Sequence, residues 1–296
     1  QTGEHTRAYL KVQDGCNQFC SYCIIPYARG RVRSRKKEEV LAEVNRLTAN
    51  GYQEFVLTGI HLSSYGIDCD DSLLSLIQAV HGIEGVKRIR LGSLEPRIIT
   101  QDFARALAGM PKICPHFHLS LQSGCDETLK RMNRRYSAGE YREKCELLRQ
   151  VFDNPALTTD VIVGFPGETE KEFQESREFI DGIRFYETHI FKYSRREGTR
   201  AAAMENQIQE SVKTQRSRDL IELGELHQRE YMESFLGKEV EILFEETVNI
   251  QGKVCWIGHT REYIRAVAKT DQNLENVIAR GTVRGFSTKD TIICEI

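Results

Sequence analysis

The first two thirds of this chain alternate short apolar runs with longer segments in which charged residues recur at helical spacing, and this alternation constrains the fold most strongly. Apolar runs of this kind are typical of buried strands, and the longer segments are typical of helices. Repeated strand-helix units build a mostly parallel sheet. The predicted strands lie at residues 9–13, 54–58, 88–92, 116–120, 158–163 and 188–193. The predicted helices include residues 37–50, 73–81, 137–152 and 170–182.

Strand-helix units in this number predict an α/β fold, a partial and open (β/α)6 version of the TIM-type barrel. In such barrels the carboxyl ends of the strands carry the chemistry. Distinctive residues follow the predicted strands here: Cys16, Thr58, Gly59, Ser93, Glu95, Gln122, Ser123 and residues 164–168. Gly and Pro also mark ordinary loops, so each motif taken singly is equally consistent with turn chemistry.

The last third of the chain has a different pattern. Residues 206–235 are polar and heavily charged with few helix breakers, which predicts one long helix. Short strand-like runs follow at residues 240–244, 252–257, 263–268, 277–283 and 291–294. Closely spaced short strands are typical of a small barrel of the oligonucleotide-binding kind. We therefore expect an α/β domain over residues 1–204, a helical connector over 205–236 and an all-β barrel over 237–296.

Three cysteines follow the first predicted strand in one short loop, Cys16-Asn-Gln-Phe-Cys20-Ser-Tyr-Cys23. Three thiolates from one loop can hold an iron-sulfur cluster and leave one of its irons without a protein ligand. Structural zinc requires four ligands, and the next His and Cys, His61 and Cys69, lie outside the loop. A two-cysteine redox motif leaves Cys16 unexplained. A zinc site completed from elsewhere and three unrelated buried thiols are the alternatives.

The spacing Cys-x3-Cys-x2-Cys, with an aromatic residue before the last cysteine, resembles the signature of the radical S-adenosylmethionine (SAM) family. The resemblance implies a [4Fe-4S] cluster on Cys16, Cys20 and Cys23, whose fourth iron chelates SAM, with Tyr22 against the adenine. Reductive cleavage of SAM then yields a 5′-deoxyadenosyl radical that abstracts a hydrogen atom. Further cofactor-binding residues are expected at Thr58, Gly59, Ser93, Glu95, Gln122, Ser123, Asp160 and Val163.

Motifs along nearly the whole chain resemble the methylthiotransferase branch of that family. They lie at residues 7–16, 23–35, 57–61, 91–96, 118–124, 160–168 and 193–199. The form Ile25-Pro-Tyr-Ala-Arg-Gly-Arg31 is most similar to the bacterial enzymes that methylthiolate carbon 2 of N6-threonylcarbamoyladenosine at tRNA position 37. Relatives that act on isopentenyl-adenosine in tRNA, or on an aspartate of ribosomal protein S12, are the alternatives.

The resemblance also implies cofactors and partners beyond the first cluster. One SAM donates a methyl group to a sulfur, and a second yields the radical that activates adenine C2. Family members carry a preceding domain with a second [4Fe-4S] cluster. Because this chain begins at Gln1 and reaches Cys16 almost at once, we expect a fragment that makes the radical but does not complete sulfur insertion alone. An electron donor such as flavodoxin or ferredoxin is an expected partner.

Positive charge is concentrated around the cysteine loop. Residues 1–37 hold eight Lys or Arg and two Asp or Glu, a net of +6 in a chain whose total is −2. A phosphate backbone bound here would bring its base near the cysteines, whereas the alternative is a solvated loop before a helix. Lys36 and Lys37 oppose the dipole of the helix that they begin, which suggests another use. The candidate RNA-binding residues are Arg29, Arg31, Arg33 and Arg35.

Two other regions bear on nucleic-acid binding. Lys130, Arg131, Arg134 and Arg135 form a second basic group, which is either an RNA contact or ordinary surface. Residues 237–296 hold eight basic and nine acidic residues, so charge alone does not predict RNA binding there. That barrel resembles the family's RNA-binding TRAM domain, which suits a tRNA anticodon stem-loop with unstacked bases.

Composition excludes several other classes of protein. No run approaches the roughly 20 apolar residues of a membrane span, and the start lacks a signal-peptide pattern. The other six cysteines are scattered singly, which suits reduced thiols in a cytoplasmic protein without membrane contact. The rival from another class is a non-enzymatic RNA-binding protein with a structural metal, or an electron-transfer iron-sulfur protein. Electron transfer normally uses four cysteine ligands, which argues against it here.

Overall fold

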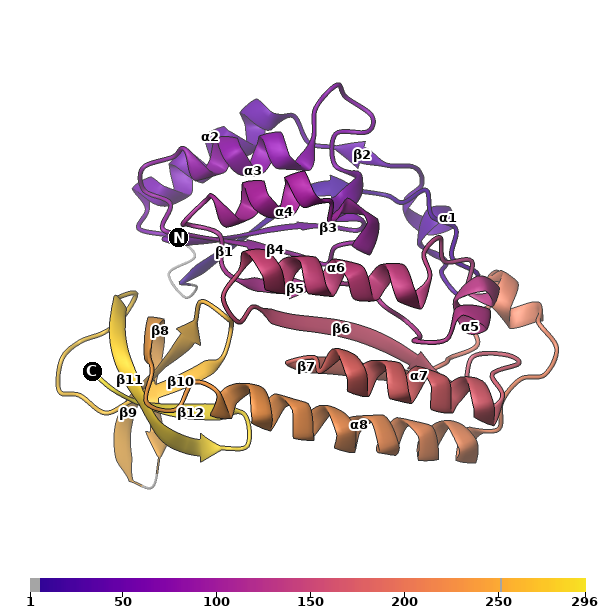
Figure 1. Ribbon diagram of the computed structural model, residues 1–296. Coiled ribbons are helices and arrows are strands. Elements are labelled where there is room, and N and C mark those ends of the chain that lie inside the picture. Colours follow the sequence, from indigo (N-terminus) through magenta and orange to yellow (C-terminus); the bar gives the residue numbers. More distant parts are fainter. Residues whose placement is uncertain (1–5, 251) are drawn as a thin grey trace.

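A computed structural model describes residues 6–250 and 252–296. Its larger part is a curved sheet in which the parallel strands follow the order β1, β3, β4, β5, β6 and β7 (Figure 1). Bridges from Ile89 to Ile113 and from Leu94 to Leu119 connect the β4 side to the β5 side. The strands are β1 (Arg7–Asp14), β2 (Arg33–Ser34), β3 (Glu54–Gly59), β4 (Arg88–Leu91), β5 (His116–His118), β6 (Ala156–Val163) and β7 (Glu187–Lys192).

Helices cover one face of this sheet. Along β1, Ala8, Leu10 and Val12 are buried in the main core, whereas Tyr9 between them is 62% exposed on the other face. The same core contains the apolar faces of α2 (Lys37–Ala49), α3 (Leu73–His81), α4 (Gln101–Ala108), α6 (Ala138–Val151) and α7 (Glu170–Ile183). Because side chains alternate along a strand, the residues between the buried ones face the uncovered side.

Local sequence explains where several helices begin. Ser137 and Thr169 start α6 and α7 with capping boxes, in which Glu140 and Glu172 reach back to the cap residues. At the start of α2, the ammonium group of Lys37 lies 3.0 Å from the carboxylate of Asp71. Lys37 therefore has a structural partner for the charge that opposes the helix dipole, and RNA is not needed to explain it.

The last part of the chain forms the predicted small barrel. The long helix α8 (Glu210–Glu233) leads into a closed barrel with the strand order β10-β12-β11-β8-β9, which has its own apolar core. The strands are β8 (Glu239–Ile250), β9 (Lys253–Thr260), β10 (Arg265–Ala268), β11 (Ile278–Thr288) and β12 (Thr291–Glu295). Both parts of the predicted fold, the open α/β barrel and the all-β barrel, are confirmed. Among the described residues, no helix is long and apolar enough to span a membrane.

The small barrel lies against the amino ends of the sheet strands, away from α1 (Ile25–Arg29) and α5 (Asp126–Arg131) (Figure 1). Glu54, which is fully buried, forms ion pairs there with Arg7, with Arg90 at 2.7 Å and with Arg88 at 3.4 Å. Those arginines also contact the barrel. Arg7 and Arg88 pair with its glutamates, and Arg90 donates to two of its backbone carbonyls. We call this set the basal network.

Most predicted elements match the structure within a few residues, but short ones were missed. Helix α4 is absent from the predicted set although its first turn is capped by Thr100, whose hydroxyl accepts from the N–H of Phe103. Strand β2 has two residues, too few to show any periodicity. Helices α1 and α5 are also short and lie in the loops around the cysteines.

Candidate functional site

The cysteine loop begins with a turn that requires glycine. Gly15 has φ of +71°, and a Cβ added there would lie 1.9 Å from the carbonyl oxygen of Arg31. The N–H of Cys16 donates to the carbonyl of Gly30 at 3.1 Å, so the loop closes against the end of α1. The turn thus places Cys16 at the carboxyl end of β1, where the barrel comparison predicted functional residues.

Gln13 connects the cysteine loop to the next strand. Its buried side-chain amide donates to the carbonyls of Asp14 and Gly15, each at 2.8 Å. Its side-chain oxygen accepts from the N–H of His61 at 2.7 Å. Gln13 thereby fixes the loop relative to the segment after β3, and the sequence reasoning gave it no role.

The other side of the cysteine loop is held by the segment that follows α5. The N–H of Ser21 donates to the carbonyl of Met132 at 3.0 Å, and its hydroxyl donates to that of Arg131 at 2.8 Å. The amide of Asn133 donates to the carbonyl of Phe19 at 2.9 Å. Phe19 and Asn133 both have positive φ, a conformation that these contacts maintain.

Arg134 contacts a cysteine directly. Its guanidinium group donates to Sγ of Cys20 at 3.3 Å, to the carbonyl of Ser120 at 3.4 Å and to the hydroxyl of Tyr136 at 2.9 Å. Arg131, from the same basic group, pairs with Glu172 at 2.8 Å. Of this group, Arg134 is held at the cysteine loop, whereas Arg131 forms a partly exposed ion pair. Local charge spacing does not show which arginines the fold turns inward.

The three thiols are free, and they influence one another. Burial raises the pKa of Cys16, the N–H of Gln18 opposes this shift, and neighbouring Cys20 and Cys23 add to it. Burial likewise raises the pKa of Cys23, with a further contribution from Cys20. Three thiolates gathered this way need positive charge, which Arg134 supplies only in part and a metal centre supplies in full. The loop therefore fits an iron-sulfur cluster.

The donor spacing bears on the zinc alternative. Over residues 6–250 and 252–296, one group of three residues has donor atoms that all lie within 4.8 Å of one another, as one ion requires: His118, Asp160 and His189. The cysteine thiols are not part of such a set. Their wider arrangement favours a polynuclear cluster over a single zinc ion.

Several predicted cofactor-binding residues meet beside this loop. A Cβ on Gly59 would lie 2.8 Å from the side-chain oxygen of Gln13, so the strand ends approach closely there. The hydroxyl groups of Ser93 and Ser120 lie 2.8 Å apart, next to Arg134. Thr58 donates its hydroxyl to the carbonyl of Leu10 at 3.2 Å. Glu95 is buried and pairs with Arg97 at 2.6 Å, which already compensates its charge.

The remaining predicted cofactor residues are more dispersed. Gln122 has φ of +72°, and its N–H donates to the carbonyl of Asp160 at 2.8 Å. Ser123 is buried and accepts from the N–H of Cys125. The side chain of Val163 lies in the main core, so only its backbone is available to a ligand. Tyr22 packs edge-on against Phe165 with ring centroids 6.4 Å apart.

The four candidate RNA-binding arginines differ in how far their charges are already paired. Arg29 and Arg31 are exposed, and the guanidinium of Arg31 lies 4.9 Å from the ring centroid of Phe19. Arg33 is 57% exposed and lies 3.5 Å from Asp14. Arg35 is 35% exposed and pairs with Glu43 at 2.8 Å. Of these four side chains, Arg29 and Arg31 are therefore the most available to an RNA phosphate.

Comparison with known proteins places the chain in a family. Residues 10–180, which include the cysteine loop and strands β3 to β6, match the family described as the Radical SAM superfamily. This chain belongs to the radical SAM superfamily.

Solved structures of other proteins show the same fold. The radical S-adenosylmethionine methyltransferase TsrM of Kitasatospora setae, solved with cobalamin and a [4Fe-4S] cluster bound, has a TM-score of 0.56 at 18% identity. The match covers 66% of this chain and 38% of the TsrM chain. Methylornithine synthase PylB has a TM-score of 0.54 at 12% identity, and the match covers 75% of this chain and 63% of the PylB chain.

Curated relatives carry closer sequence similarity to this radical SAM chain. The threonylcarbamoyladenosine tRNA methylthiotransferase MtaB of Bacillus subtilis is 42% identical over 94% of this chain and 62% of its own length. The tRNA-2-methylthio-N(6)-dimethylallyladenosine synthase of Acetivibrio thermocellus is 40% identical over 97% of this chain and 61% of its own. The chain thus spans about three fifths of the length of these relatives.

Proposed function

We propose that this chain provides the radical-generating part of a tRNA methylthiotransferase that acts on N6-threonylcarbamoyladenosine at position 37. The cysteine loop at the carboxyl end of β1 carries the proposal. It gathers three free thiols, two of them with raised pKa values, within a superfamily defined by this chemistry. A loop with three cysteines leaves one iron of a [4Fe-4S] cluster open for SAM, which argues against a closed electron-transfer centre.

Each group around the loop has a distinct task in this proposal. Cys16, Cys20 and Cys23 bind the cluster, and Arg134 stabilises the charge on the Cys20 sulfur. Gln13 and Gly15 fix the turn so that the thiols stay in place. When bound, the cluster supplies the electron that cleaves SAM. The segments at Thr58, Gly59, Ser93, Gln122 and Ser123 offer the polar groups that orient SAM, with Tyr22 near the adenine.

Two named activities of relatives compete for the substrate. The Bacillus subtilis and Chlamydia pneumoniae relatives named for threonylcarbamoyladenosine are 42% and 43% identical to this chain. Relatives named for dimethylallyladenosine reach 41%. We favour the threonylcarbamoyl substrate because the relatives named for it have the higher identities, 42% and 43% against 39–41%.

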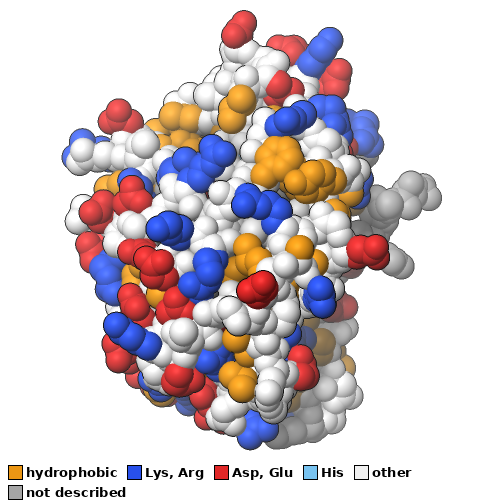
Figure 2. Space-filling model, turned by 90° about the vertical axis from the view of Figure 1, so that its right-hand side faces the viewer, with side chains coloured by type: hydrophobic (Ala, Val, Ile, Leu, Met, Phe, Trp, Pro, Cys, Tyr) orange, Lys and Arg blue, Asp and Glu red, His pale blue; other side chains and the backbone are white. Residues whose placement is uncertain are grey.

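The surface beside the cysteine loop suits single-stranded RNA. Tyr27 is 61% exposed, and its ring lies 5.6 Å from that of Phe19, which in turn contacts Arg31. Exposed aromatic rings next to arginines are typical platforms for unstacked bases. Figure 2 faces the side where α1 and α5 lie in Figure 1, and it shows Lys and Arg side chains among exposed hydrophobic ones in its central part.

The small barrel has less charge to offer an RNA backbone. Arg280, Arg284 and Lys289 pair with Glu239, Glu295 and Glu225, at distances of 3.1, 2.6 and 2.6 Å. A TRAM-like role for residues 237–296 therefore relies on shape and on contacts with sugars or bases. An external one-electron donor, of the flavodoxin or ferredoxin kind, completes the proposed set of partners.

Radical formation in the presence of defined tRNAs tests the proposal. The chain is reconstituted anaerobically with iron and sulfide, and 5′-deoxyadenosine is measured with SAM and dithionite. We expect tRNA that carries threonylcarbamoyladenosine 37 to stimulate 5′-deoxyadenosine formation several-fold. Control tRNAs carry adenosine or isopentenyl-adenosine at the same position. Stronger stimulation by the isopentenyl tRNA would favour the alternative substrate, and no 5′-deoxyadenosine under any condition would overturn the radical assignment.

A further inference from the structure

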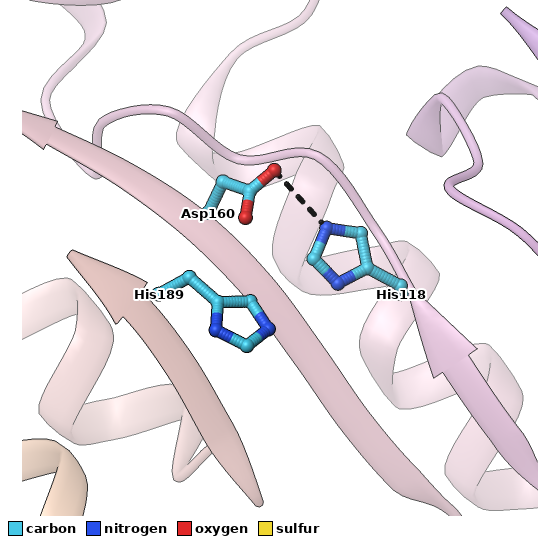
Figure 3. A group of neighbouring side chains, drawn as sticks. All are labelled: His118, Asp160 and His189. Carbon is cyan, nitrogen blue, oxygen red and sulfur yellow. Dashed lines mark ion pairs between the residues drawn. The ribbon is translucent and has the colours of Figure 1, made fainter. Parts of the chain in front are cut away.

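Three potential metal ligands lie together on the uncovered face of the sheet. His118 ends β5, Asp160 lies in β6 and His189 lies in β7 (Figure 3). The register pairs Asp160 with His189 and His118 with Thr158, which is two residues before Asp160. Residues two apart on a strand face the same side, so the three side chains share one face. Figure 3 shows both imidazole rings beside the carboxylate of Asp160.

The distances suit a single ion. Nε2 of His118 lies 3.2 Å from Oδ2 of Asp160, and one donor atom from each of the three residues lies within 4.8 Å of the others. Ligands bound at about 2.0–2.2 Å in a tetrahedron lie roughly 3.3 Å apart. The His118–Asp160 pair already has that spacing.

A neighbouring hydroxyl orients one of the ligands. Nδ1 of His118 lies 2.9 Å from the hydroxyl oxygen of Thr158, which itself belongs to β6. This contact leaves Nε2 of His118 directed to Asp160, as in metal sites where the second ring nitrogen is held by the protein. All three ligands come from adjacent strands of a hydrogen-bonded sheet, which is a more rigid support than a loop.

A simple ion pair does not account for the third residue. His118 and Asp160 alone satisfy each other, yet the ring of His189 stacks on that of His118 with centroids 5.7 Å apart and an interplanar angle of 27°. Two imidazoles that converge on one carboxylate are the donor set of the two-histidine, one-carboxylate metal sites. The His118 and Asp160 side chains are 16% and 31% exposed, so an ion has a path to the site.

We propose that His118, Asp160 and His189 bind one divalent first-row transition-metal ion. Three protein ligands leave at least one coordination position, which takes water or an oxygen donor of a bound molecule. The site uses none of the cysteines. The proposal rests on the geometry of β5, β6 and β7 and holds whether or not the tRNA activity is correct.

Cobalt(II) binding tests this site, because its absorption spectrum reports ligand type. The variant Cys16→Ala/Cys20→Ala/Cys23→Ala removes the three thiols of the cysteine loop, and circular dichroism checks that it folds. We expect it to bind one equivalent of Co(II) with a d–d spectrum that lacks the intense thiolate-to-cobalt charge-transfer band. Adding Asp160→Asn, which keeps the shape of the side chain, is expected to weaken binding at least tenfold. His189→Ala is expected to do the same.

His81→Gln is the matched control, since His81 ends α3 on the helix-covered side. Binding lost in Asp160→Asn and His189→Ala but retained in His81→Gln supports the site. Absence of Co(II) binding in the folded variant that lacks Cys16, Cys20 and Cys23 overturns it. So does binding that neither Asp160→Asn nor His189→Ala weakens, or that His81→Gln weakens equally.

Discussion

The two ends of the same sheet differ in how far their charged groups are paired. At the amino ends, the basal network sets Arg7, Arg88 and Arg90 against Glu54 and two glutamates of the small barrel. At the carboxyl ends, thiols with raised pKa values lie beside one partly buried arginine, Arg134. In the basal network, arginines and glutamates pair fully and fix the small barrel on the sheet. At the cysteine loop, the charge that three thiolates would carry is only partly balanced, which leaves a place for a charged cofactor. The difference separates what holds this molecule together from what it does.

The largest effect is expected from Cys20→Ala at the carboxyl end. Removing one of three ligands should abolish cluster assembly, since no spare thiol lies in the loop. The free energy of unfolding should change by less than about 1 kcal/mol, because Cys20 is only partly buried. Iron and sulfide analysis after reconstitution measures the first effect, and urea unfolding the second. Cys69→Ala, at an exposed cysteine outside the loop, is the control. A normal cluster in Cys20→Ala would contradict the assignment.

Glu54→Gln, at the amino end, should have the opposite effect: it should lower stability and leave cluster assembly intact. Neutralising the carboxylate leaves the buried guanidinium groups of Arg7, Arg88 and Arg90 undercompensated, which costs about 3–5 kcal/mol in the free energy of unfolding. Folded protein should still assemble the cluster. Urea unfolding and iron content measure the two properties. Glu239→Gln, in an exposed pair with Arg280, should lower stability by about 0.5 kcal/mol or less. Equal effects of the two substitutions would remove the distinction between the ends.

Acid should reduce the stability that the basal network contributes, because Glu54 becomes protonated at low pH. Burial alone would raise the pKa of Glu54, but Arg90, Arg7 and Arg88 outweigh it and lower the pKa from 4.5 to about 2. Since the folded pKa lies below the unfolded one, this stabilisation is complete above pH about 4.5 and is lost as pH falls toward about 2. Its size is about 3 kcal/mol. Unfolding measured between pH 5 and 3 should therefore depend less on pH in Glu54→Gln than in the wild type, and parallel curves would refute this.

Gly15→Ala tests the turn that presents Cys16. The added methyl group meets the carbonyl of Arg31 in a backbone conformation that disfavours alanine, at a cost of about 1–3 kcal/mol. We expect the loop to shift and the yield of reconstituted cluster to fall. Gly285→Ala is the control, because a Cβ there meets nothing within 4 Å. If both variants assemble the cluster equally well, the turn does not determine the thiol arrangement.

The smallest effect concerns RNA. Arg31 is exposed, whereas Arg35 is already paired with Glu43, so Arg31→Ala should weaken tRNA binding about three- to tenfold and Arg35→Ala less. The salt dependence of binding should also become less steep in Arg31→Ala. Fluorescence anisotropy with a labelled anticodon stem-loop measures both. A larger loss from Arg35→Ala would reverse the predicted order of contacts.

Sequence patterns predicted the fold well because its signals are local. Helix α3 was predicted at its observed residues, and the strands around it within a few positions, since periodicity acts over short windows. The cysteine spacing and the positions of Ser93 and Gly59 after strands are also local. The role of Arg134 stayed open because its partner, Cys20, lies 114 positions away, and Arg7 was not linked to Glu245, 238 positions away. Contacts of that range depend on tertiary packing, which no local pattern encodes.

The most direct test of the cofactor assignment is a SAM-cleavage measurement on the reconstituted chain. Anaerobic protein with about four iron and four sulfide per chain is mixed with SAM and dithionite, and 5′-deoxyadenosine is quantified. The account predicts 5′-deoxyadenosine from the wild type and from Glu54→Gln that remains folded, and none from Cys20→Ala. A fully loaded wild-type cluster that leaves SAM intact, or equal cleavage by Cys20→Ala, would contradict it.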